Sequence, residues 1–446
     1  MKATRALSVA SSLALLYDGS LAATSGSINV LAMNVAGLPA ILNDNAVPGD
    51  KATNAGLIGS KFAQYGYSVI HVQEDFNYHA YIYATDNHPY RTATSGGVPF
   101  GDGLNTLSKH DWVNFRRIEW EQCSNASGAD CLTPKGFTFM RLALSGSTDN
   151  TTTVYVDFYN IHTDAGTEAD DLTARQANIN QVAAYISTWS SGNAVVIFGD
   201  TNSRYSRTGD TAVRSLLASG FTDAWVENQR GGVVPTVESL CSNPSTVNTC
   251  ETVDKIFYRS SPLVTLKATS FRYDSTRFLQ ANGSILSDHN PVYADFTWSA
   301  GTSFRQSAYF GGDYGTWFSD VPTLSTKTKP KPSTLTFRGA SRLDSVGLTL
   351  TDGTSLVHGG TGGTTVSLAL SSTEYWVEAR LCKGDKSGQT RNFYIRAATS
   401  AGRTLVAGTA TADCATFVAP EGWHIVGFVG QAGDEMDELA FVYAPR

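Results

Sequence analysis

The sequence lacks an excess of basic residues, and this absence limits what the chain can bind through charge alone. Its 33 Lys and Arg residues are outnumbered by 40 Asp and Glu residues, which gives a formal net charge of −7. A chain of this charge offers no broad positive field to a polyanion. Binding to nucleic acid would therefore need a local patch or a metal ion.

Long apolar runs are absent beyond the N-terminus. There, Lys2 and Arg5 precede an apolar run that is too short to span a bilayer and is typical of a secretory signal. We therefore predict a signal peptide at residues 1–22, cut after Ala22, and a secreted, extracellular protein with no transmembrane segment.

Cysteine is scarce, with six residues and no close CxxC pair, so zinc is a weak alternative to disulfides. Six cysteines allow 15 connectivities, and an extracellular protein is expected to use them as disulfides. The spacing favours three local pairs: Cys123 with Cys131, Cys241 with Cys250, and Cys382 with Cys414. Sequons that predict surface glycosylation lie at Asn125, Asn150 and Asn282.

The pattern of apolar residues changes near residue 300, at "FTWSAGTSF". Upstream, strand-like segments alternate with helical ones; they are "SINVLAMNVAG", "YSVIHVQE", "VYVDFYNIHT", "AVVIFGD", "VDKIFY" and "PVYADFTW". Apolar residues at helical spacing predict an amphipathic helix through Leu172, Ile179, Val182, Ile186 and Trp189. Downstream, short strand-like runs such as "STLTFRG" and "YWVEARL" recur between turns. The pattern predicts an α/β domain followed by an all-β domain.

Polar side chains stand where several of these strands begin or end. They are Asn34, Glu74, Asn160 with His162, Asp200 with Asn202, and Asp288 with His289. Residues i and i+2 of a strand share a face, so each spaced pair offers two polar groups to one side. Such oxygens suit a hard cation such as Mg²⁺, and the histidines could move protons near neutral pH. A single Asp-x-Asn is more often a turn or helix cap, but repetition at so many strand ends favours a site.

The order of these segments resembles the endonuclease/exonuclease/phosphatase superfamily over residues 27–298. The segments are "LAMNVAGLP", "HVQED", "YNIHTDAG", "FGDTNS", "VDKIFY" and "LSDHNPV". The resemblance implies a four-layer α/β sandwich of the deoxyribonuclease-I type and Mg²⁺-dependent phosphate ester hydrolysis, with Mn²⁺ or Ca²⁺ as alternative ions.

The resemblance also implies a role for each residue of the site. Glu74 would be the principal metal ligand, with Asn34 and Asp288 near the same cation. Asp200 and Asn202 would orient the attacking water and the phosphate. His289 would be the general base, held in its tautomer by Asp254. His162 and Asn160 would contact the phosphate and assist the leaving oxygen, although no carboxylate that orients His162 is identified.

The resemblance implies a phosphodiester substrate, either a lipid head group or nucleic acid. "QEDFN", "NIHTDAG" and the Gly-rich connection before "LSK" resemble the sphingomyelinase branch. No Trp-Phe hairpin for membrane insertion is evident, and "NFRRIEWEQC" is an unremarkable substitute, so peripheral membrane contact stays a hypothesis. A nuclease would use a basic phosphate path through Arg91, Arg204 and Arg207, which are otherwise solvated surface.

Residues 303–446 resemble a jacalin-type lectin, on "YFGGDYGTWFSD", "RLDSVGLTLTDG" and "WHIVGFVGQAGDEMDELAFVY". The resemblance implies a β-prism that binds glycans through Gly311 and Gly312 in one loop and Gly433 and Asp437 in another. Between the last two, "DEM" replaces the aromatic residue that often stacks on the sugar. A β-prism kept for structure or protein contact is the alternative.

Three hypotheses remain open from the sequence. The first is a secreted, sphingomyelinase-like phosphodiesterase targeted to glycan surfaces by a lectin domain. The second is a secreted deoxyribonuclease-like nuclease, whose activity should depend steeply on salt. The third is a carbohydrate-binding protein with an inactive hydrolase domain.

Overall fold

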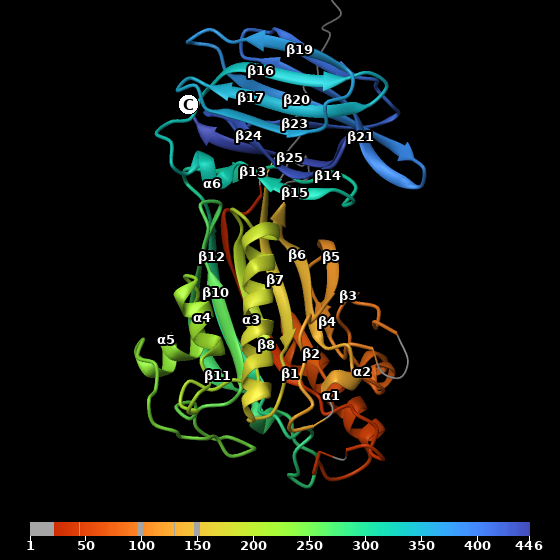
Figure 1. Ribbon diagram of the computed structural model, residues 1–446, viewed down its shortest axis with the longest axis vertical. Coiled ribbons are helices and arrows are strands. Elements are labelled where there is room, and N and C mark those ends of the chain that lie inside the picture. The colour runs from red at the N-terminus through yellow and green to blue at the C-terminus, as the bar shows by residue number, and fades with distance from the viewer. Residues whose placement is uncertain (1–21, 44, 97–100, 129, 147–151) are drawn as a thin grey trace, which may run out of the picture.

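The computed structural model describes residues 22–43, 45–96, 101–128, 130–146 and 152–446, and it contains an α/β part and a β part stacked end to end (Figure 1). The predicted signal peptide, except for its last residue, lies outside the described residues, and so does Asn150. No helix of these described ranges combines the length and apolar character needed to cross a bilayer.

The N-terminal domain is built on two six-stranded sheets. The first contains β1 (Ser25–Asn34), β2 (Val69–Gln73), β3 (Tyr90–Arg91), β4 (Asn105–Ser108), β11 (Val264–Tyr273) and β12 (Val292–Ala300), in the order β11-β12-β1-β2-β4-β3. The second contains β5 (Trp112–Glu119), β6 (Gly136–Gly146), β7 (Thr153–His162), β8 (Ala194–Asp200), β9 (Thr222–Asp223) and β10 (Asp254–Arg259), in the order β5-β6-β7-β8-β10-β9.

Helices cover the outer faces of the two sheets. They are α1 (Lys51–Tyr65), α2 (His79–Thr85), α3 (Ala169–Trp189), α4 (Ala212–Ala218) and α5 (Ala224–Arg230). Alternate residues of β1 show the layering: Val30 and Ala32 pack into the core between the sheets, whereas Leu31 and Met33 pack with α1. The four-layer sandwich and the helix through Ile179 and Val182 are confirmed.

The residues of the predicted site fall at one end of this sandwich because of how its central strands run. β7 and β8 are parallel and both finish there, as do β1 and β2. The neighbouring β10 and β12 run antiparallel to these strands and start at the same end. The C-terminal domain caps the opposite end (Figure 1).

The C-terminal domain is a prism of three sheets. The sheet nearest the N-terminal domain contains β13 (Arg305–Gln306), β14 (Phe310–Gly311), β15 (Thr316–Ser319), β24 (Trp423–Ala432) and β25 (Met436–Pro445). The second contains β16 (Pro332–Gly339), β17 (Leu343–Leu350), β18 (Ser355–Gly359) and β19 (Thr364–Ala369). The third contains β20 (Trp376–Lys386), β21 (Gln389–Thr399), β22 (Thr404–Gly408) and β23 (Asp413–Val418). The all-β prediction is confirmed, and the domain also contains one short helix, α6 (Val321–Leu324).

All three disulfide pairs predicted from spacing are confirmed. Cys382 and Cys414 are directly opposite each other on β20 and β23, so this bridge lies within the third sheet of the prism. The other two close short loops of the N-terminal domain.

Candidate active site

Strand register places Asp200 at the centre of the polar cluster. Asp200 is the last residue of β8 and lies opposite His162 of the parallel β7 and Asp254 of the antiparallel β10. The His162 Nε2 atom is 3.5 Å from Asp200 Oδ2. The pairing of these strands therefore brings together His162, Asp200 and Asp254, which lie far apart in the sequence.

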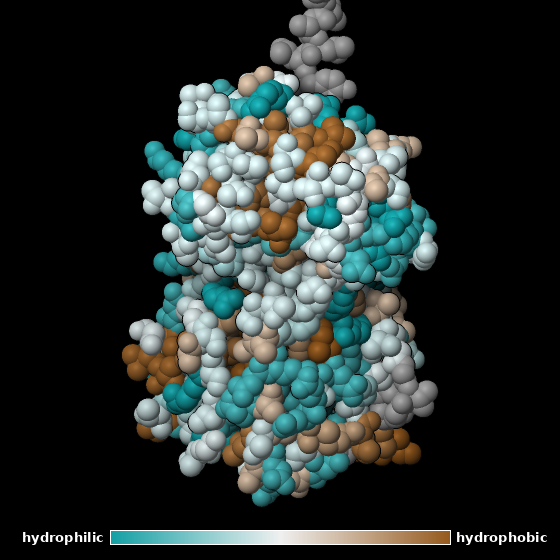
Figure 2. Space-filling model, turned by 45° about the horizontal axis from the view of Figure 1, so that its top comes forward, coloured by the Kyte–Doolittle hydropathy of each residue, from teal (hydrophilic) through white to brown (hydrophobic). Residues whose placement is uncertain are grey.

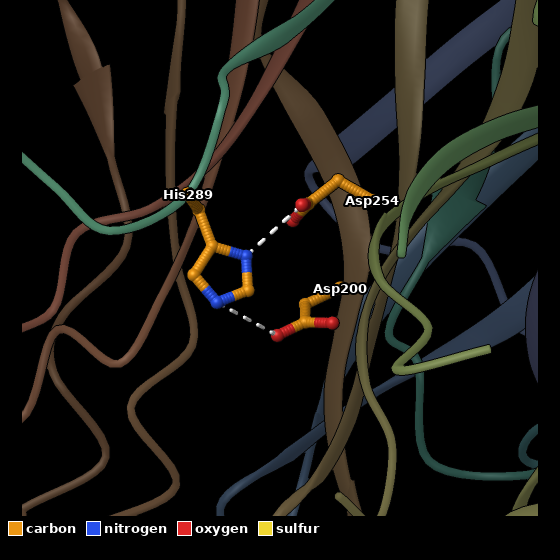
Figure 3. A group of neighbouring side chains, drawn as sticks. All are labelled: Asp200, Asp254 and His289. Carbon is orange, nitrogen blue, oxygen red and sulfur yellow. Dashed lines mark hydrogen bonds and ion pairs between the residues drawn. The ribbon is translucent and has the colours of Figure 1, made fainter. Parts of the chain in front are cut away.

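His289 enters this cluster from the loop before β12, with its ring between two carboxylates (Figure 3). Its Nδ1 is 2.9 Å from Asp254 Oδ2, and its Nε2 is 3.9 Å from Asp200 Oδ2. Burial disfavours the imidazolium, but Asp254 and Asp200 outweigh burial and raise the pKa of His289 well above its ordinary value. A histidine oriented in this way, with Nε2 directed toward the site, has the geometry of a general base.

Glu74 directly follows β2, and Asn34 is the last residue of β1. These two residues extend the cluster into the first sheet. Asn34 Nδ2 donates to Glu74 Oε1 at 3.1 Å and to Asp200 Oδ2 at 3.2 Å, so one amide joins the two carboxylates. Glu74 has a φ of 55°, a left-handed backbone conformation that is uncommon for a non-glycine residue. Burial raises the pKa of Glu74, against the opposing effects of Asn34 and His289.

The donor set at Glu74 fits a divalent cation. The Glu74 Oε2 atom is buried and has no hydrogen-bond partner in the part of the chain that the structure describes. An unpaired buried carboxylate oxygen costs free energy unless a cation or donor satisfies it. Asp200, Asp254 and His289 also bring ligand-type atoms within 4.8 Å of one another. Because Asp254 already accepts from His289, these three residues have a geometry suited to proton transfer, whereas the unpartnered oxygen of Glu74 could contact a cation.

His162 lies in the predicted place, but its surroundings bear on its predicted role. It is fully buried, and its Nδ1 finds no hydrogen-bond partner among the described residues. Burial, together with the positive charges of Lys135 and His289, lowers the pKa of His162 well below its ordinary value. His162 is therefore neutral here and fits a hydrogen-bonding role better than that of a proton donor.

Asn160 requires a correction, because its side chain joins the two sheets instead of facing the site opening. Its amide donates to the carbonyls of Val72 at 3.0 Å and Asn105 at 3.1 Å, and its Oδ1 accepts from Gln73 at 2.6 Å. The residue is completely buried. No donor remains for a phosphate, so the prediction of phosphate contact is wrong for this residue.

Asn202 and Asp288 sit at the edge of the cluster. The Asn202 N–H donates to Asp200 Oδ1 at 2.9 Å, and its side-chain amide donates to Thr163 O at 3.1 Å, which leaves its Oδ1 uncommitted to these bonds. Asp288 is exposed and accepts from Asn45 at 3.1 Å. The charge of Asp288 acts on the pKa of both Glu74 and His289, which places it beside them.

Lys135 is a charged neighbour of the site that the sequence reasoning missed. Its ammonium is 2.7 Å from Asp130, next to the Cys123–Cys131 disulfide, and its charge lowers the pKa of His162. Burial raises the pKa of Asp200, and Lys135 is among the cations that oppose that rise. No strand-end pattern marks Lys135, because the strand that follows it, β6, is not among the strand-like segments recognised in the sequence.

The four predicted sugar-binding residues also come together, but their carboxylate is already paired. The Gly312 N–H donates to Asp437 O at 3.0 Å. Asp437 is 1% exposed, and its Oδ1 lies 2.7 Å from Arg391 of β21. Glu435, within the "DEM" segment between Gly433 and Asp437, lies 2.6 Å from both Arg342 and Lys386. A glycan that uses Asp437 would have to replace Arg391.

The arginines of the nuclease hypothesis are engaged by protein groups. Arg204 pairs with Glu238 at 2.6 Å, and Arg207 pairs with Asp210 at 2.9 Å. Arg91 donates to Tyr83 O at 2.6 Å. Because the three guanidinium groups are already bonded to protein oxygens, they would have to break these contacts to bind phosphates along a nucleic acid.

Comparison with protein-family models identifies both parts of the chain. The model described as endonuclease/exonuclease/phosphatase family 2 matches residues 51–230, and the jacalin-like lectin domain model matches residues 307–442. The chain joins an endonuclease/exonuclease/phosphatase domain to a jacalin-like lectin domain. The catalytic cluster lies in the first domain, and the Gly311 to Asp437 cluster lies in the jacalin-like domain.

Curated relatives match more than half of the chain. Proteins called sphingomyelinase from Mycobacterium tuberculosis and Mycobacterium bovis are each 37% identical to this chain over 283 residues, which cover 62% of this chain and 54% of each relative. The chain thus spans about half the length of the curated relatives it matches.

Solved structures resemble each domain separately. Sphingomyelinase C from Streptomyces griseocarneus is 19% identical with a TM-score of 0.42, and the match covers 60% of this chain and 99% of that one. A mannose-binding jacalin-related lectin from Ananas comosus is 18% identical with a TM-score of 0.28, and the match covers 32% and 99%.

Proposed function

We propose that this protein is a metal-dependent phosphodiesterase of the sphingomyelinase type, which releases phosphocholine from sphingomyelin. The observation that carries the proposal is the meeting of Glu74, Asp200 and the His289–Asp254 pair at one end of the two sheets. The 37% identity to proteins called sphingomyelinase supports the choice of substrate. The engaged arginines make nucleic acid the weaker alternative.

The residues act on a phosphodiester in distinct ways. In its neutral form, His289 takes a proton from the attacking water through Nε2, while Asp254 holds Nδ1–H and stabilises the imidazolium that forms. The water oxygen bonds to phosphorus, the bond to the ceramide oxygen breaks, and that oxygen takes a proton from water. Neutral His162 donates a hydrogen bond to the phosphate. Glu74, with Asp288 and a reoriented Asn34 nearby, would hold Mg²⁺, whose positive charge stabilises the charge that develops on the phosphate.

We further propose that the jacalin-like domain binds glycans and that the protein is exported. A bound glycan would hold the enzyme at a surface and raise the local substrate concentration. Export is supported by the leader pattern at residues 1–22 and by three disulfides. Binding to immobilised mannose and galactose tests the first proposal, and a secreted product that begins at Ala23 is the expected result for the second.

The deciding experiment offers the purified full chain equal amounts of sphingomyelin vesicles and double-stranded DNA, with Mg²⁺ and then with EDTA. We expect EDTA-sensitive release of phosphocholine and no DNA nicking. DNA nicking alone, with a steep loss of rate as salt rises, would overturn the lipid substrate and favour the nuclease. No hydrolysis of either substrate, with retained glycan binding, would favour an inactive hydrolase domain.

A further inference from the structure

Exposed aliphatic side chains gather on two loops at the catalytic end of the N-terminal domain. Ile41 and Leu42 lie in the loop between β1 and α1, and Val237, Leu240 and Val247 lie in the loop between α5 and β10. Ile41 is 93% exposed and Val237 is 78% exposed. Figure 2 shows apolar patches near both sides of the lower part of the molecule. Single exposed aliphatics are ordinary on a soluble protein, but a group at one end marks an interaction surface.

Both loops are attached directly to the segment that carries His289. From the first loop, Asn45 Nδ2 donates to Asp288 Oδ2 at 3.1 Å. From the second loop, Asn243 Nδ2 donates to Ser287 O at 2.8 Å, and the Ser245 N–H donates to Asn290 Oδ1 at 3.0 Å. The aliphatic residues therefore stand on loops that border the catalytic cluster on two sides.

The loops are built so that these side chains point outward. The buried Lys51 Nζ donates to the carbonyl oxygens of Ala36, Leu38 and Asn43 at 2.7 to 2.8 Å, which ties the first loop to α1. The Cys241–Cys250 disulfide closes the second loop. Because polar groups and a disulfide fix the interior of each loop, the aliphatic residues are left to the outside.

Charge identifies the partner that these loops fit. Residues 35–50 and 231–254 contain no lysine and no arginine. A surface that binds nucleic acid or anionic lipid needs basic residues, whereas an aliphatic surface without them gains free energy at an uncharged membrane interface. Glu238, an acidic residue of the second loop, is paired with Arg204.

We propose that these two loops dock the enzyme on a zwitterionic lipid bilayer, with Ile41, Leu42, Val237, Leu240 and Val247 entering the interface. This inference rests on the proposed function, because docking in this orientation presents lipid head groups to the catalytic cluster. The jacalin-like domain lies at the far end of the sheets and does not cover the loops (Figure 1).

The test measures binding separately from hydrolysis. The full chain and two double variants, I41S/L42S and V237S/L240S, are cosedimented with vesicles of sphingomyelin and phosphatidylcholine in EDTA. The vesicles contain no glycolipid, so the jacalin-like domain has no ligand. The matched control is V357S/V406S, which removes two aliphatic residues that are 60% and 42% exposed on the jacalin-like domain. Hydrolysis of a water-soluble phosphodiester, bis(p-nitrophenyl) phosphate, is measured in parallel with Mg²⁺.

We expect each loop variant to weaken vesicle binding about tenfold to a hundredfold, because two aliphatic side chains no longer leave water. The control variant should bind like the unchanged protein, and the loss in the loop variants should be confined to vesicles. Unchanged vesicle binding in both loop variants would overturn the docking surface, as would an equal loss on the soluble substrate. If the unchanged protein nicks DNA and ignores vesicles, the proposed function itself fails.

Discussion

Asp200 uses its two carboxylate oxygens for different purposes. Oδ1 accepts the N–H of Asn202, as in an ordinary Asx-turn, while Oδ2 faces Asn34, His162 and His289. The turn and the catalytic site are therefore not competing explanations of the Asp-x-Asn motif. The turn fixes the carboxylate so that its second oxygen points into the site.

Replacing Glu74 by Gln separates cation binding from folding. We expect E74Q to hydrolyse phosphodiesters at least about a hundredfold more slowly, because the principal anionic ligand is lost. In EDTA its Tm should equal or exceed that of the unchanged protein, because a buried, unpaired carboxylate oxygen is removed. The upward shift of Tm with Mg²⁺ should disappear, as followed by differential scanning fluorimetry. E121Q, at an exposed position, is the control, and a persistent Mg²⁺ shift in E74Q would contradict the assignment.

Lys135 should contribute to the rate through its charge. We expect K135M to lower kcat about tenfold or more, because a cation beside the site stabilises charge that develops on the phosphate. K267M removes an exposed lysine on β11 and should change little. Steady-state kinetics of both variants check this prediction, and an unchanged kcat in K135M would limit Lys135 to its pair with Asp130.

At the scale of elements, the two domains meet through buried polar and aromatic groups. Arg141 of β6 pairs with Asp157 of β7 at 2.7 Å, and its guanidinium lies 3.8 Å from the ring centre of Trp317 of β15. Asn114 of β5 donates to Glu438 of β25 at 3.1 Å and accepts from Gln431 at 3.0 Å. Side chains from both domains also share one apolar core. The jacalin-like domain is therefore packed directly against the sandwich, and the two domains share a buried interface.

Removing Arg141 should expose how strongly this contact stabilises the protein. We expect R141M to lower the free energy of unfolding by about 3–5 kcal/mol, because Asp157 would remain buried without its cation. The control is R396M, whose pair with Glu378 is about one-third exposed, and it should cost at most about 1 kcal/mol. Urea unfolding of both variants provides the comparison, and equal losses would show that burial of the Arg141 pair is unimportant.

At the scale of the whole molecule, a buried neutral histidine in each domain contributes to the response to acid. His71 lies between the sheets of the first domain and His424 lies in the prism, and both are buried. Burial lowers the pKa of His71 to about 3 and that of His424 to about 4, from 6.5. At each of these two histidines, the unfolded chain therefore binds more protons than the folded chain below about pH 6.5.

The contribution of each of these two histidines to stability should accordingly fall as pH falls from about 6.5 toward 4. Each such histidine contributes a slope of up to about 1.4 kcal/mol per pH unit. We expect H424Q to lose less stability than the unchanged protein across this range, although its stability at pH 7 can differ. Urea unfolding at pH 7, 6, 5 and 4.5 measures the difference in slope, and parallel acid profiles would refute a neutral, buried His424.

How much of the site is predictable from sequence is clear from individual residues. Polar residues at strand ends identified Glu74, Asp200 and His289, because apolar runs and their ends are local features. The i, i+2 rule also gave the right face for Asn160. The rule did not give the position of Asn160 along the strand. Asn160 lies two residues before His162, the last residue of β7, and is therefore about 6.6 Å further inside the sandwich. There it meets the backbone of β2 and cannot reach a phosphate.

The sequence by itself determined the order of the two domains, the strands whose ends carry the site, and the disulfides that close short loops. These depend on the period of apolar residues and on short spacings, which act over a few residues. Only the tertiary structure decided that Asp200 lies between His162 and Asp254, that Asp437 is paired with Arg391, and that the charge of Lys135 acts on His162. Those contacts depend on strand register and on packing between distant segments, and no local pattern records which segments will meet.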